Sequence, residues 1–351
     1  MRKVLFFGEI YPNSINGVSV ANLTNLNFLK EKVVVDIIIE ENNFRDHEKI
    51  SCYKIITILR QLFKVLIKSA CNRYDTLYLV FSLSILGGIK TLLAIICYRF
   101  FINGNVIIHI HRGDFFLNFY TNVFSKQLSN LIFKLTDRLI VLSDNQKVEM
   151  SVFKSLKIEV LYNTVESEQL NINVNRRNKK FIYISNYLPQ KGIFELLDVF
   201  KELKDLYPNI LLETYGAFSD EGIKKRILNY CDKNIYINST VQGDEKYHKL
   251  ITSDCLVLPS WNEGQPLVIL EAMSVGLPII STKVGLIPEL LGEDYVYLAN
   301  PQDVNSLKDK IVEFINSIDN DLISIQLKEK YNQLYCREKH KNRLFEIFDC
   351  I

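Results

Sequence analysis

The stretch that decides the fold runs from Ser253 to Leu291 and reads S-D-C-L-V-L-P-S-W-N-E-G-Q-P-L-V-I-L-E-A-M-S-V-G-L-P-I-I-S-T-K-V-G-L-I-P-E-L-L. Its first apolar run, Cys255 to Leu258, predicts a short buried strand. The segment from Pro259 to Gln265 interrupts this run, and Pro266 suits the first turn of a helix, where its missing N–H group is not needed. Apolar residues then recur at helical spacing, and a second apolar run, Leu277 to Ile280, predicts another strand. We therefore expect a strand–loop–helix–strand unit.

Two carboxylates lie around the start of this helix, Glu263 in the loop and Glu271 within the helix. The first turn of a helix has unpaired backbone N–H groups at the positive end of a dipole, so it attracts phosphate. We expect the N–H groups of Gly264, Gln265 and Leu267 to face a diphosphate. Carboxylates would repel a phosphate, but they accept hydrogen bonds from the neighbouring hydroxyls of sugars and riboses. The alternative, in which both acids are ordinary solvated charges, does not explain why so many features agree.

The segment from Glu263 to Leu291 resembles the E-x7-E signature of the family 4 glycosyltransferases, which have the GT-B fold and retain the anomeric configuration. This resemblance implies that Glu263 contacts the donor sugar and Glu271 the nucleotide ribose. It also implies that backbone groups from Gly264 to Leu267, with Gln265 and Pro266 between them, hold the sugar and the diphosphate. Family members often carry an aromatic residue where this chain has Gln265.

Strands and helices alternate along the rest of the chain, which indicates parallel sheets covered by helices on both faces. One series precedes the polar stretch Glu166 to Lys180, which has the composition of a linker, and a second series follows it. We predict an α/β protein of GT-B architecture, in which two facing Rossmann-like domains have a cleft between them. The predicted domains are an acceptor-side domain over residues 1–166 and a nucleotide-sugar-binding domain over residues 167–329. The resemblance implies that a last helix, near Leu327 to Phe348, packs back on the first domain, which residues from about 330 to 351 would then join.

The loops that follow predicted strands supply further candidates for the donor site. Asn16 and Gly17 follow the first strand, tolerate unusual backbone angles and open a helix. The family usually has two adjacent glycines there, so Asn16 departs from its pattern. Lys191, in the segment Y-I-S-N-Y-L-P-Q-K-G, is the diphosphate cation that the resemblance implies. Gly216 lies in a turn that resembles the family's turn near the base.

Two histidines, His109 and His111, end a predicted strand and share one of its faces, because their spacing is two. Such a pair could suggest a metal, but no third ligand is evident, and a core position is the simpler interpretation of His109. The resemblance aligns His111 with a histidine that reaches the donor sugar and diphosphate, where it could donate to the departing oxygen. Arg112 and Asp114 lie nearby and are candidates for contact with the acceptor.

The largest departure from the family pattern is Ser185-Asn186, where many members have Gly-Arg. A second cation for the diphosphate is therefore missing. Either Arg112 or Lys180 takes its place, or the leaving group is held less tightly. The departure keeps open a non-catalytic homologue that acts as a partner subunit, and a phosphorylase or epimerase of similar fold is a further alternative.

Composition is typical of a globular protein. The 351 residues are 48% hydrophobic and 23% charged, with a net charge of +2, which is compatible with two domains of ordinary size. The seven cysteines show no C-x-x-C pair and no metal-ligand spacing, which favours a reducing compartment. The first apolar run is too short for a signal peptide, so we expect a cytoplasmic protein. The apolar segment from Leu77 to Ile102 is divided by glycines and charges, and is expected to be a strand and a buried helix rather than a membrane span.

Charge is unevenly distributed along the chain. Residues 1–160 hold 20 Lys and Arg against 13 Asp and Glu, which suggests an anionic partner. Within them, the segment from Ile58 to Arg73 is amphipathic, and Arg60, Lys64 and Lys68 would form one stripe on a helix. An anionic membrane surface is therefore a candidate partner. The alternative is a surface helix that packs on its own domain.

These features and the resemblance together predict a hexosyltransferase that uses a nucleotide-diphospho-sugar donor, and the resemblance implies that it retains the anomeric configuration. Lys191, the helix start near Gly264 and His111 would stabilise the departing oxygen, and Glu263 and Glu271 would orient the donor. The expected acceptor is a glycan or lipid-linked saccharide of a bacterial surface polysaccharide, and no nucleic acid, cofactor or metal is expected. A D-x-D sequence, Asp319 to Asp321, lies between two C-terminal helices and is interpreted as a polar helix cap. The sequence does not distinguish UDP from GDP.

Overall fold

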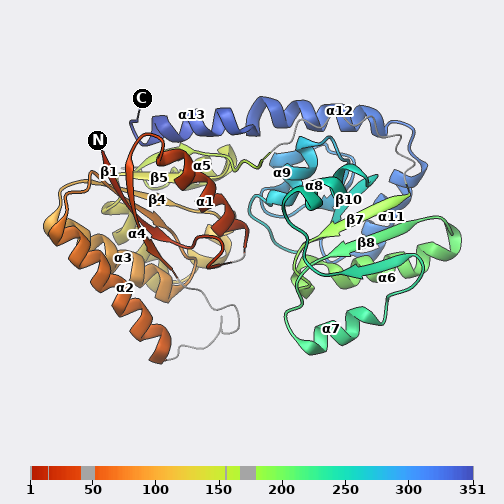
Figure 1. Ribbon diagram of the computed structural model, residues 1–351, viewed down its shortest axis with the longest axis horizontal. Coiled ribbons are helices and arrows are strands. Elements are labelled where there is room, and N and C mark those ends of the chain that lie inside the picture. Colours follow the sequence, from red (N-terminus) through yellow and green to blue (C-terminus); the bar gives the residue numbers. More distant parts are fainter. Residues whose placement is uncertain (1, 15, 41–51, 155, 167–178, 351) are drawn as a thin grey trace. The chain divides into compact units, whose positions relative to one another are not determined.

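A computed structural model of the chain describes residues 2–14, 16–40, 52–154, 156–166 and 179–350. It divides into two compact units (Figure 1), one of Met1–Asn163 with Glu338–Ile351 and the other of Thr164–Arg337. Most of the predicted linker, residues 167–178, lies outside the described residues.

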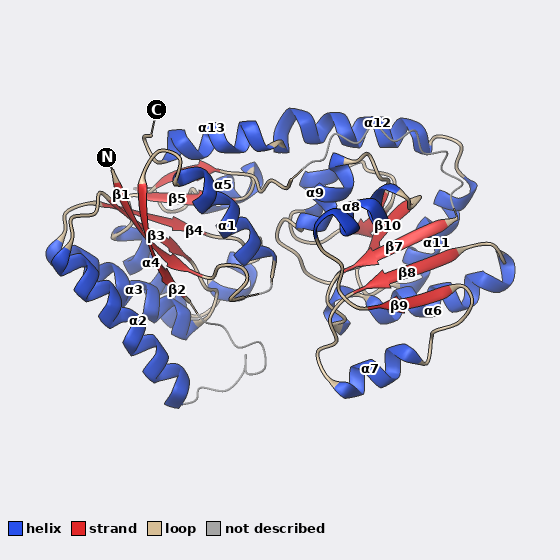
Figure 2. Ribbon diagram, in the orientation of Figure 1, coloured by secondary structure: helices blue, strands red, loops and turns tan. Residues whose placement is uncertain are grey.

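The N-terminal unit is a six-stranded parallel sheet in the order β2-β1-β3-β4-β5-β6. Figure 2 shows its helices on both sides of the sheet. Its strands are β1 (Lys3–Gly8), β2 (Val34–Ile39), β3 (Thr76–Val80), β4 (Asn105–His109), β5 (Arg138–Val141) and β6 (Lys157–Val160). Its helices are α1 (Gly17–Leu29), α2 (Cys52–Cys71), α3 (Ile85–Phe101), the π-helical turn η1 (Phe115–Phe119), α4 (Val123–Lys134), α5 (Asp144–Met150) and α13 (Arg337–Ile347).

The alternation of side chains along β1 shows how the two faces of this sheet are covered. Val4 and Phe6 belong to an apolar cluster that includes side chains of α1 and α13. Leu5 and Phe7 point to the other face and belong to a cluster with side chains of α2, α3 and α4. Both faces are therefore buried, as in other sheets built from parallel strands.

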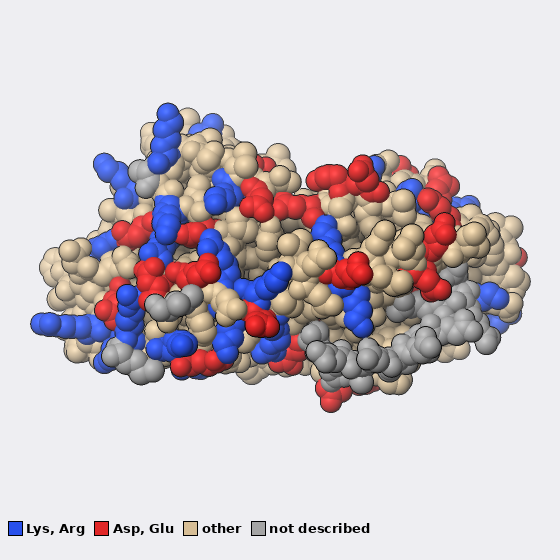
Figure 3. Space-filling view, turned by 90° about the horizontal axis from the view of Figure 1, so that it is seen from above, with Lys and Arg blue, Asp and Glu red and all other residues tan. Residues whose placement is uncertain are grey.

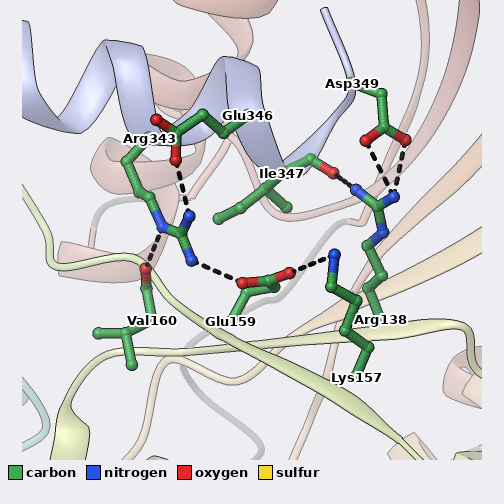
Figure 4. A network of polar contacts seen from close by, with 8 residues as sticks. All are labelled: Arg138, Lys157, Glu159, Val160, Arg343, Glu346, Ile347 and Asp349. Carbon is green, nitrogen blue, oxygen red and sulfur yellow. Dashed lines mark hydrogen bonds and ion pairs between the residues drawn. The ribbon is translucent and has the colours of Figure 1, made fainter.

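Helix α13 is held on the N-terminal unit by ion pairs as well as by apolar contacts (Figure 4). Arg343 Nη2 lies 2.6 Å from Glu159 Oε2, and Lys157 Nζ lies 2.9 Å from the other oxygen of the same carboxylate. Arg138 of β5 donates two hydrogen bonds to Asp349, just after the helix. These contacts explain why the last helix belongs to the first unit although it is distant in sequence.

The C-terminal unit is a second six-stranded parallel sheet, in the order β12-β11-β10-β7-β8-β9. On one of its faces, the ring of Phe181 packs edge-on against Phe200 and Phe314. Its strands are β7 (Lys180–Ile184), β8 (Leu211–Tyr215), β9 (Ile235–Asn238), β10 (Cys255–Leu258), β11 (Ile279–Thr282) and β12 (Leu298–Ala299). Its helices are η2 (Pro189–Lys191), α6 (Ile193–Leu206), α7 (Glu221–Leu228), α8 (Gly243–Ile251), α9 (Leu267–Ser274), α10 (Ile287–Leu291), α11 (Val304–Asn316), α12 (Asn320–Lys330) and η3 (Tyr331–Tyr335).

The predicted last helix, near Leu327 to Phe348, is wrong as a single element. Helix α12 passes into the π-helical turn η3, and the chain is extended at Cys336 (φ −66°, ψ 152°) before α13 begins. The strand and helix predicted for Leu77 to Ile102 are confirmed as β3 and α3. Within the described parts of the chain, no helix has the length and apolar character needed to cross a membrane.

We predict that Glu159→Gln lowers the free energy of unfolding by about 1.5–3 kcal/mol at pH 7, because hydrogen bonds to charged groups have this magnitude. Burial raises the pKa of Glu159, but its contacts with Lys157 and Arg343 outweigh burial and bring the pKa below the ordinary 4.5. Because the folded-state pKa is lowered, this stabilisation is present above pH 4.5 and is lost as the pH falls through the folded-state value. The difference between the variant and the parent in urea unfolding should therefore shrink at low pH.

Glu346→Gln is the matched control, since Glu346 contacts the same arginine from an exposed position. It should change stability by less than about 0.5 kcal/mol, as exposed ion pairs do. Equal effects of the two substitutions would contradict the assignment of Glu159 as the anchor of α13.

Candidate functional site

The central feature of the C-terminal unit is the point where the strand order reverses. The chain passes from β7 to β8 and β9 on one side, then returns to place β10 on the other side of β7. Ligands in such sheets bind at the carboxyl ends of the strands that flank this reversal. Lys191 follows β7 and Glu263 follows β10, and Lys191 Nζ lies 2.7 Å from Glu263 Oε1. The structure therefore brings together two of the predicted site residues.

The loop that carries Glu263 is fixed by two glycines in the left-handed region. A Cβ on Gly192 (φ 72°) would lie 2.0 Å from Pro259 O, and a Cβ on Gly285 (φ 54°) would lie 1.8 Å from Glu263 O. Both positions therefore require glycine for backbone angle and for space. Trp261 anchors the same loop, because its backbone N–H donates to Gln190 O and its ring N–H donates to Glu195 at 2.8 Å.

The Glu263 carboxylate has one oxygen occupied and one available to a ligand. Both Lys191 Nζ and Ser260 Oγ donate to Oε1, each at 2.7 Å. Ser260 is fully buried, so this contact fixes the orientation of the carboxylate. The second oxygen, Oε2, can accept from a hydroxyl of a bound molecule.

Glu271 lies on α9, is 9% exposed and pairs with Lys246 of α8. Lys246 Nζ donates to Oε1 at 2.6 Å and also contacts Oε2. Burial raises the pKa of Glu271, and the positive charge of Lys246 opposes this rise. The positive charge of Lys246 thus favours the ionised form of a carboxylate whose neutral form burial favours.

Helix α9 begins at Leu267, so Pro266 occupies the N-cap position rather than the first helical turn. Its extended backbone (φ −68°, ψ 123°) corrects the predicted placement by one residue. The N–H groups of Leu267 and Val268 lie in the first turn, where helices have no internal acceptor for them. Gln265 is buried, and Gly264 accepts a hydrogen bond from Leu286 N, so the loop before the helix is well packed.

Gly216 and the Ser185-Asn186 pair are in contact, as the carboxyl ends of β7 and β8 adjoin. A Cβ on Gly216 would lie 2.1 Å from Ser185 O, so only glycine fits. The proposal that Lys180 replaces the missing arginine is not supported, because Lys180 begins β7 whereas Lys191 follows the opposite end of that strand. Lys180 pairs instead with Glu213 at 3.2 Å.

In the N-terminal unit, His111 is buried and held in one orientation by Asn22. Asn22 Nδ2 donates to Glu9 O at 2.8 Å, which leaves Asn22 Oδ1 facing His111 Nε2 at 3.0 Å. Burial and the charge of His340 lower the pKa of His111 to about 3, so the ring is neutral at pH 7 with its proton on Nε2. Nδ1 is buried without a partner among the described residues, and in this tautomer it can accept a hydrogen bond but cannot donate one.

His109 lies in the core of the N-terminal unit, which was the simpler of the two interpretations of its sequence position. It is fully buried, its Nδ1 lies 2.8 Å from Tyr78 OH, and burial lowers its pKa well below the ordinary value. A polar chain continues from Tyr78 through Asn25 to His340 of α13, with Asn25 Oδ1 2.7 Å from His340 Nε2. These contacts link the strand end to the C-terminal helix of the same unit.

The other predicted residues of the N-terminal unit have local structural contacts. Asn16 caps α1 in a capping box with Ser19, and Gly17 is the exposed first residue of that helix. Arg112 Nε donates to Asp114 Oδ1 at 2.9 Å, and Asp114 also accepts from Asn118. Arg112 is therefore already paired with a carboxylate.

Asp319 stands at the N-cap position of α12 without a side-chain cap bond, and Asp321 lies in its first turn. Considering only the residues that the structure describes, no group of three or more His, Cys, Asp or Glu is placed to hold a metal ion.

Three contacts of the site were not foreseen from the sequence. Lys246 is 25 positions from Glu271, Ser260 lies in the loop itself, and Asn22 is 89 positions from His111. Ser260 could have been found, since it stands three residues before Glu263 in the same loop. Lys246 and Asn22 are brought in by helix packing, which leaves no spacing signal.

Comparison with known proteins finds glycosyltransferases among the relatives of the chain. Residues 165–328 match the family model described as Glycosyl transferases group 1. An uncharacterized glycosyltransferase of Methanocaldococcus jannaschii is 28% identical over 188 residues, which are 52% of this chain and 50% of that protein. O-antigen chain mannosyltransferase B of Escherichia coli is 28% identical over 137 residues, which are 38% of this chain and 35% of that protein. The chain thus spans half or less of the length of these curated relatives.

Anabaena HepE, solved in complex with UDP-glucose, superposes with a TM-score of 0.75 at 15% identity and full coverage of both chains. The fold is therefore the α/β two-domain GT-B fold, as predicted. The match to the group 1 glycosyl transferases covers residues 165–328, just under half of the chain, and together with the glycosyltransferase relatives it supports a glycosyltransferase of the family 4 type.

We predict that Gly192→Ala destabilises the protein more than Gly243→Ala does. Both glycines have positive φ, and the left-handed region costs an alanine about 1–2 kcal/mol in each case. Gly243 (φ 55°) has no atom within 4 Å of an added Cβ, whereas Gly192 has Pro259 O at 2.0 Å. The excess loss at Gly192, measured by urea unfolding, should be about 1–3 kcal/mol, as for other overpacked sites. Equal losses would show that the close approach at Pro259 does not constrain the loop.

We predict that His111→Asn reduces the acid sensitivity of the protein. The folded-state pKa of His111 is about 3, below the unfolded value near 6.5, so the unfolded state binds the extra proton between these values and stability falls with falling pH. At pH 5 this group alone should remove about 2 kcal/mol from the free energy of unfolding. The exposed His248→Asn, which removes a surface histidine, is the control, and its pH profile is measured beside those of the parent and His111→Asn. Matching pH profiles of parent and His111→Asn would exclude a neutral buried ring.

Proposed function

We propose that the chain is a retaining, metal-independent glycosyltransferase of hexosyltransferase type. In this proposal the donor is a nucleotide-diphospho-sugar, and the acceptor is a glycan or lipid-linked saccharide in surface polysaccharide biosynthesis, with the protein acting in the cytoplasm. The observation that carries the proposal is the meeting of Lys191 and Glu263 at the reversal of strand order, beside the start of α9. Two similar proteins support the classes of acceptor and donor: an O-antigen chain mannosyltransferase, and HepE, which was solved in complex with UDP-glucose.

The charges of the site fit a diphosphate and a sugar better than a fully anionic ligand. Lys191 and Lys246 are each paired with one carboxylate, so each lysine has an acid as partner when no ligand is bound. A diphosphate would take a hydrogen bond from Lys191 and from the first turn of α9, and each charge-assisted bond is worth about 1.5–3 kcal/mol. Glu263 Oε2 would accept from the sugar, and Glu271 would accept from the ribose.

Lys283 is the better candidate for the missing second cation. It is exposed directly after β11, the strand next to β10. Gly285, two residues further on, is the residue that touches the Glu263 backbone. Neither Lys180 nor Arg112 has an equivalent position, since each is paired with an acid elsewhere.

In the proposed reaction, the bond between the anomeric carbon and the diphosphate oxygen breaks, and its electron pair stays on the diphosphate. Lys191 and the α9 N–H groups stabilise that charge where it develops. The acceptor hydroxyl bonds to the anomeric carbon from the face that the diphosphate left, and its proton passes to the leaving phosphate. The contacts predicted for Asn16, Gly17, His111, Arg112 and Asp114 stay predictions; for His111, the tautomer favours accepting a hydroxyl hydrogen through Nδ1.

A second candidate function is a partner subunit that binds the donor without turnover. Two observations favour this function. Asn186 stands where many family members have an arginine, and lysines already pair with both Glu263 and Glu271. Binding measurements alone do not separate the two functions, so the test must include turnover.

We predict that Glu271→Gln and Glu263→Gln weaken nucleotide-sugar binding or turnover. Removing a charged hydrogen-bond partner should cost about 1.5–3 kcal/mol, which is roughly a 10- to 100-fold effect. Calorimetric titration with UDP-, GDP- and ADP-linked sugars gives affinity, and release of the nucleotide with acceptor present gives turnover. Glu213→Gln is the control, because Glu213 is also ion-paired and partly buried but lies within β8.

Parent-like affinity and turnover in both variants would contradict the proposal. Donor binding without turnover on any acceptor would favour the partner subunit. Turnover should persist in EDTA, and its loss there would refute metal independence.

A further inference from the structure

Helix α2 exposes apolar side chains to solvent, which is unusual for a helix that only packs on its own unit. Its buried positions are Gln61, Leu62, Val65 and Ser69, two of which are polar. The opposite side carries Ile56, Leu59, Phe63 and Ile67, at the spacing of three and four residues that defines one helix face. Leu59 and Phe63 are 59% and 60% exposed. A surface helix normally shows solvent its polar face.

Helix α3 continues this exposed apolar surface. It packs beside α2, and the buried side chains of both helices join one cluster on the same face of the sheet. Ile96 and Phe100 point away from that cluster, and Phe100 is 78% exposed. We call the side chains Ile56, Leu59, Phe63, Ile67, Ile96 and Phe100 the α2–α3 face. Exposed apolar side chains gathered on two neighbouring helices are a candidate site of interaction.

The exposed apolar side chains concentrate on this part of the chain. Of the 28 exposed large apolar residues found among the described positions, 14 lie on α2, α3 and α4. The helices of the C-terminal unit carry theirs singly or in pairs, which is ordinary for a globular surface.

The helices that form the α2–α3 face carry charge of one sign. Residues 52–134 contain ten Lys or Arg and two Asp or Glu, and α2, α3 and α4 contain no acid at all. The two acids are engaged elsewhere, Asp75 with the backbone of Lys3 and Asp114 with Arg112. The exposed Arg60 and Lys64 each follow one residue after an apolar member of the face, so they flank it.

This one-signed charge is not general on the N-terminal unit. Figure 3 shows the side that carries α13, where Lys and Arg are interspersed with Asp and Glu. Helix α13 takes part in ion pairs with acids, such as Lys341 with Glu31 and Arg343 with Glu346.

Lys68 of α2 and Arg99 of α3 pair with Asp36 and Asp137 of other elements. Arg60 and Lys64 are the exposed cations that adjoin the apolar side chains of α2.

We propose that the α2–α3 face docks on an anionic lipid bilayer, with Leu59, Phe63 and Phe100 entering the headgroup region and Arg60 and Lys64 facing the anionic headgroups. Apolar burial together with basic flanks is what an interfacial helix requires. A second copy of the chain is a poorer occupant, because a symmetric contact would oppose cations with cations and offers no acid to pair with them. The docking goes beyond glycosyl transfer and does not depend on it.

The test is flotation of the full chain with vesicles of phosphatidylcholine alone or with phosphatidylglycerol added. Binding is expected only with the anionic vesicles and should fall as salt is raised. Arg60→Gln with Lys64→Gln should lower the partition coefficient about 30-fold, since each basic residue near an anionic surface contributes about a factor of five. Leu59→Ser with Phe63→Ser should lower it about tenfold or more.

Matched controls lie in the C-terminal unit. Lys225→Gln with Lys233→Gln removes two exposed charges, and Leu322→Ser with Ile325→Ser removes two exposed apolar side chains. Both double variants should float as the parent does, and circular dichroism and nucleotide titration should be unchanged in all four.

Failure of the parent to float with anionic vesicles at low salt overturns the proposal, as does equal flotation of test and control variants. Sedimentation of the protein without lipid measures whether a second copy of the chain binds the α2–α3 face instead. A dimer that Leu59→Ser with Phe63→Ser dissociates, in a protein that does not float, would assign the face to a protein contact instead. None of these readouts uses turnover, so failure here is distinguishable from failure of the proposed function.

Discussion

The contact between Lys191 and Glu263 depends on the order of strands in the C-terminal unit. Because β10 returns to lie beside β7, the loops after these two strands emerge side by side at one edge of the sheet. Gly192 and Gly285 then let the backbone approach closely enough to set the lysine and the carboxylate 2.7 Å apart. Removing either charge would leave the other partly buried and unpaired, which is costly. The loop geometry and the chemistry of the site therefore have the same origin.

Both signature acids of the unit are neutralised by lysines when no ligand is bound. Glu263 is shared by Lys191 and Ser260, while Glu271 is held by Lys246 in a more buried position. A ligand that carries both phosphate and hydroxyl groups can use each partner of such a pair, since the lysine donates and the carboxylate accepts. A ligand with only one kind of group would leave the other partner unsatisfied. This is the physical reason for preferring a sugar linked to a diphosphate.

Local patterns were sufficient to predict the strand–loop–helix–strand segment from Cys255 to Thr282. A short apolar run, a proline and helical spacing determine its structure. Local patterns were insufficient for side-chain contacts that depend on how helices pack together. The helices α4 and α5 were not predicted, although Asn122 and Ser143 cap them and provided a signal. The roles of Lys246 and Asn22 had no local signal, since each reaches its partner from another helix. The break near Cys336 was also missed, because the residues around it include neither glycine nor proline.

The central claim is that the reversal of strand order holds the diphosphate of a sugar donor. A crystal structure of the chain soaked with a nucleoside diphosphate tests it most directly. The account predicts the diphosphate at the first turn of α9, with Lys191 Nζ within about 3.2 Å of a phosphate oxygen and Glu271 accepting from the ribose hydroxyls. A nucleotide bound elsewhere, with Lys191 still on Glu263 and no phosphate near α9, would contradict it.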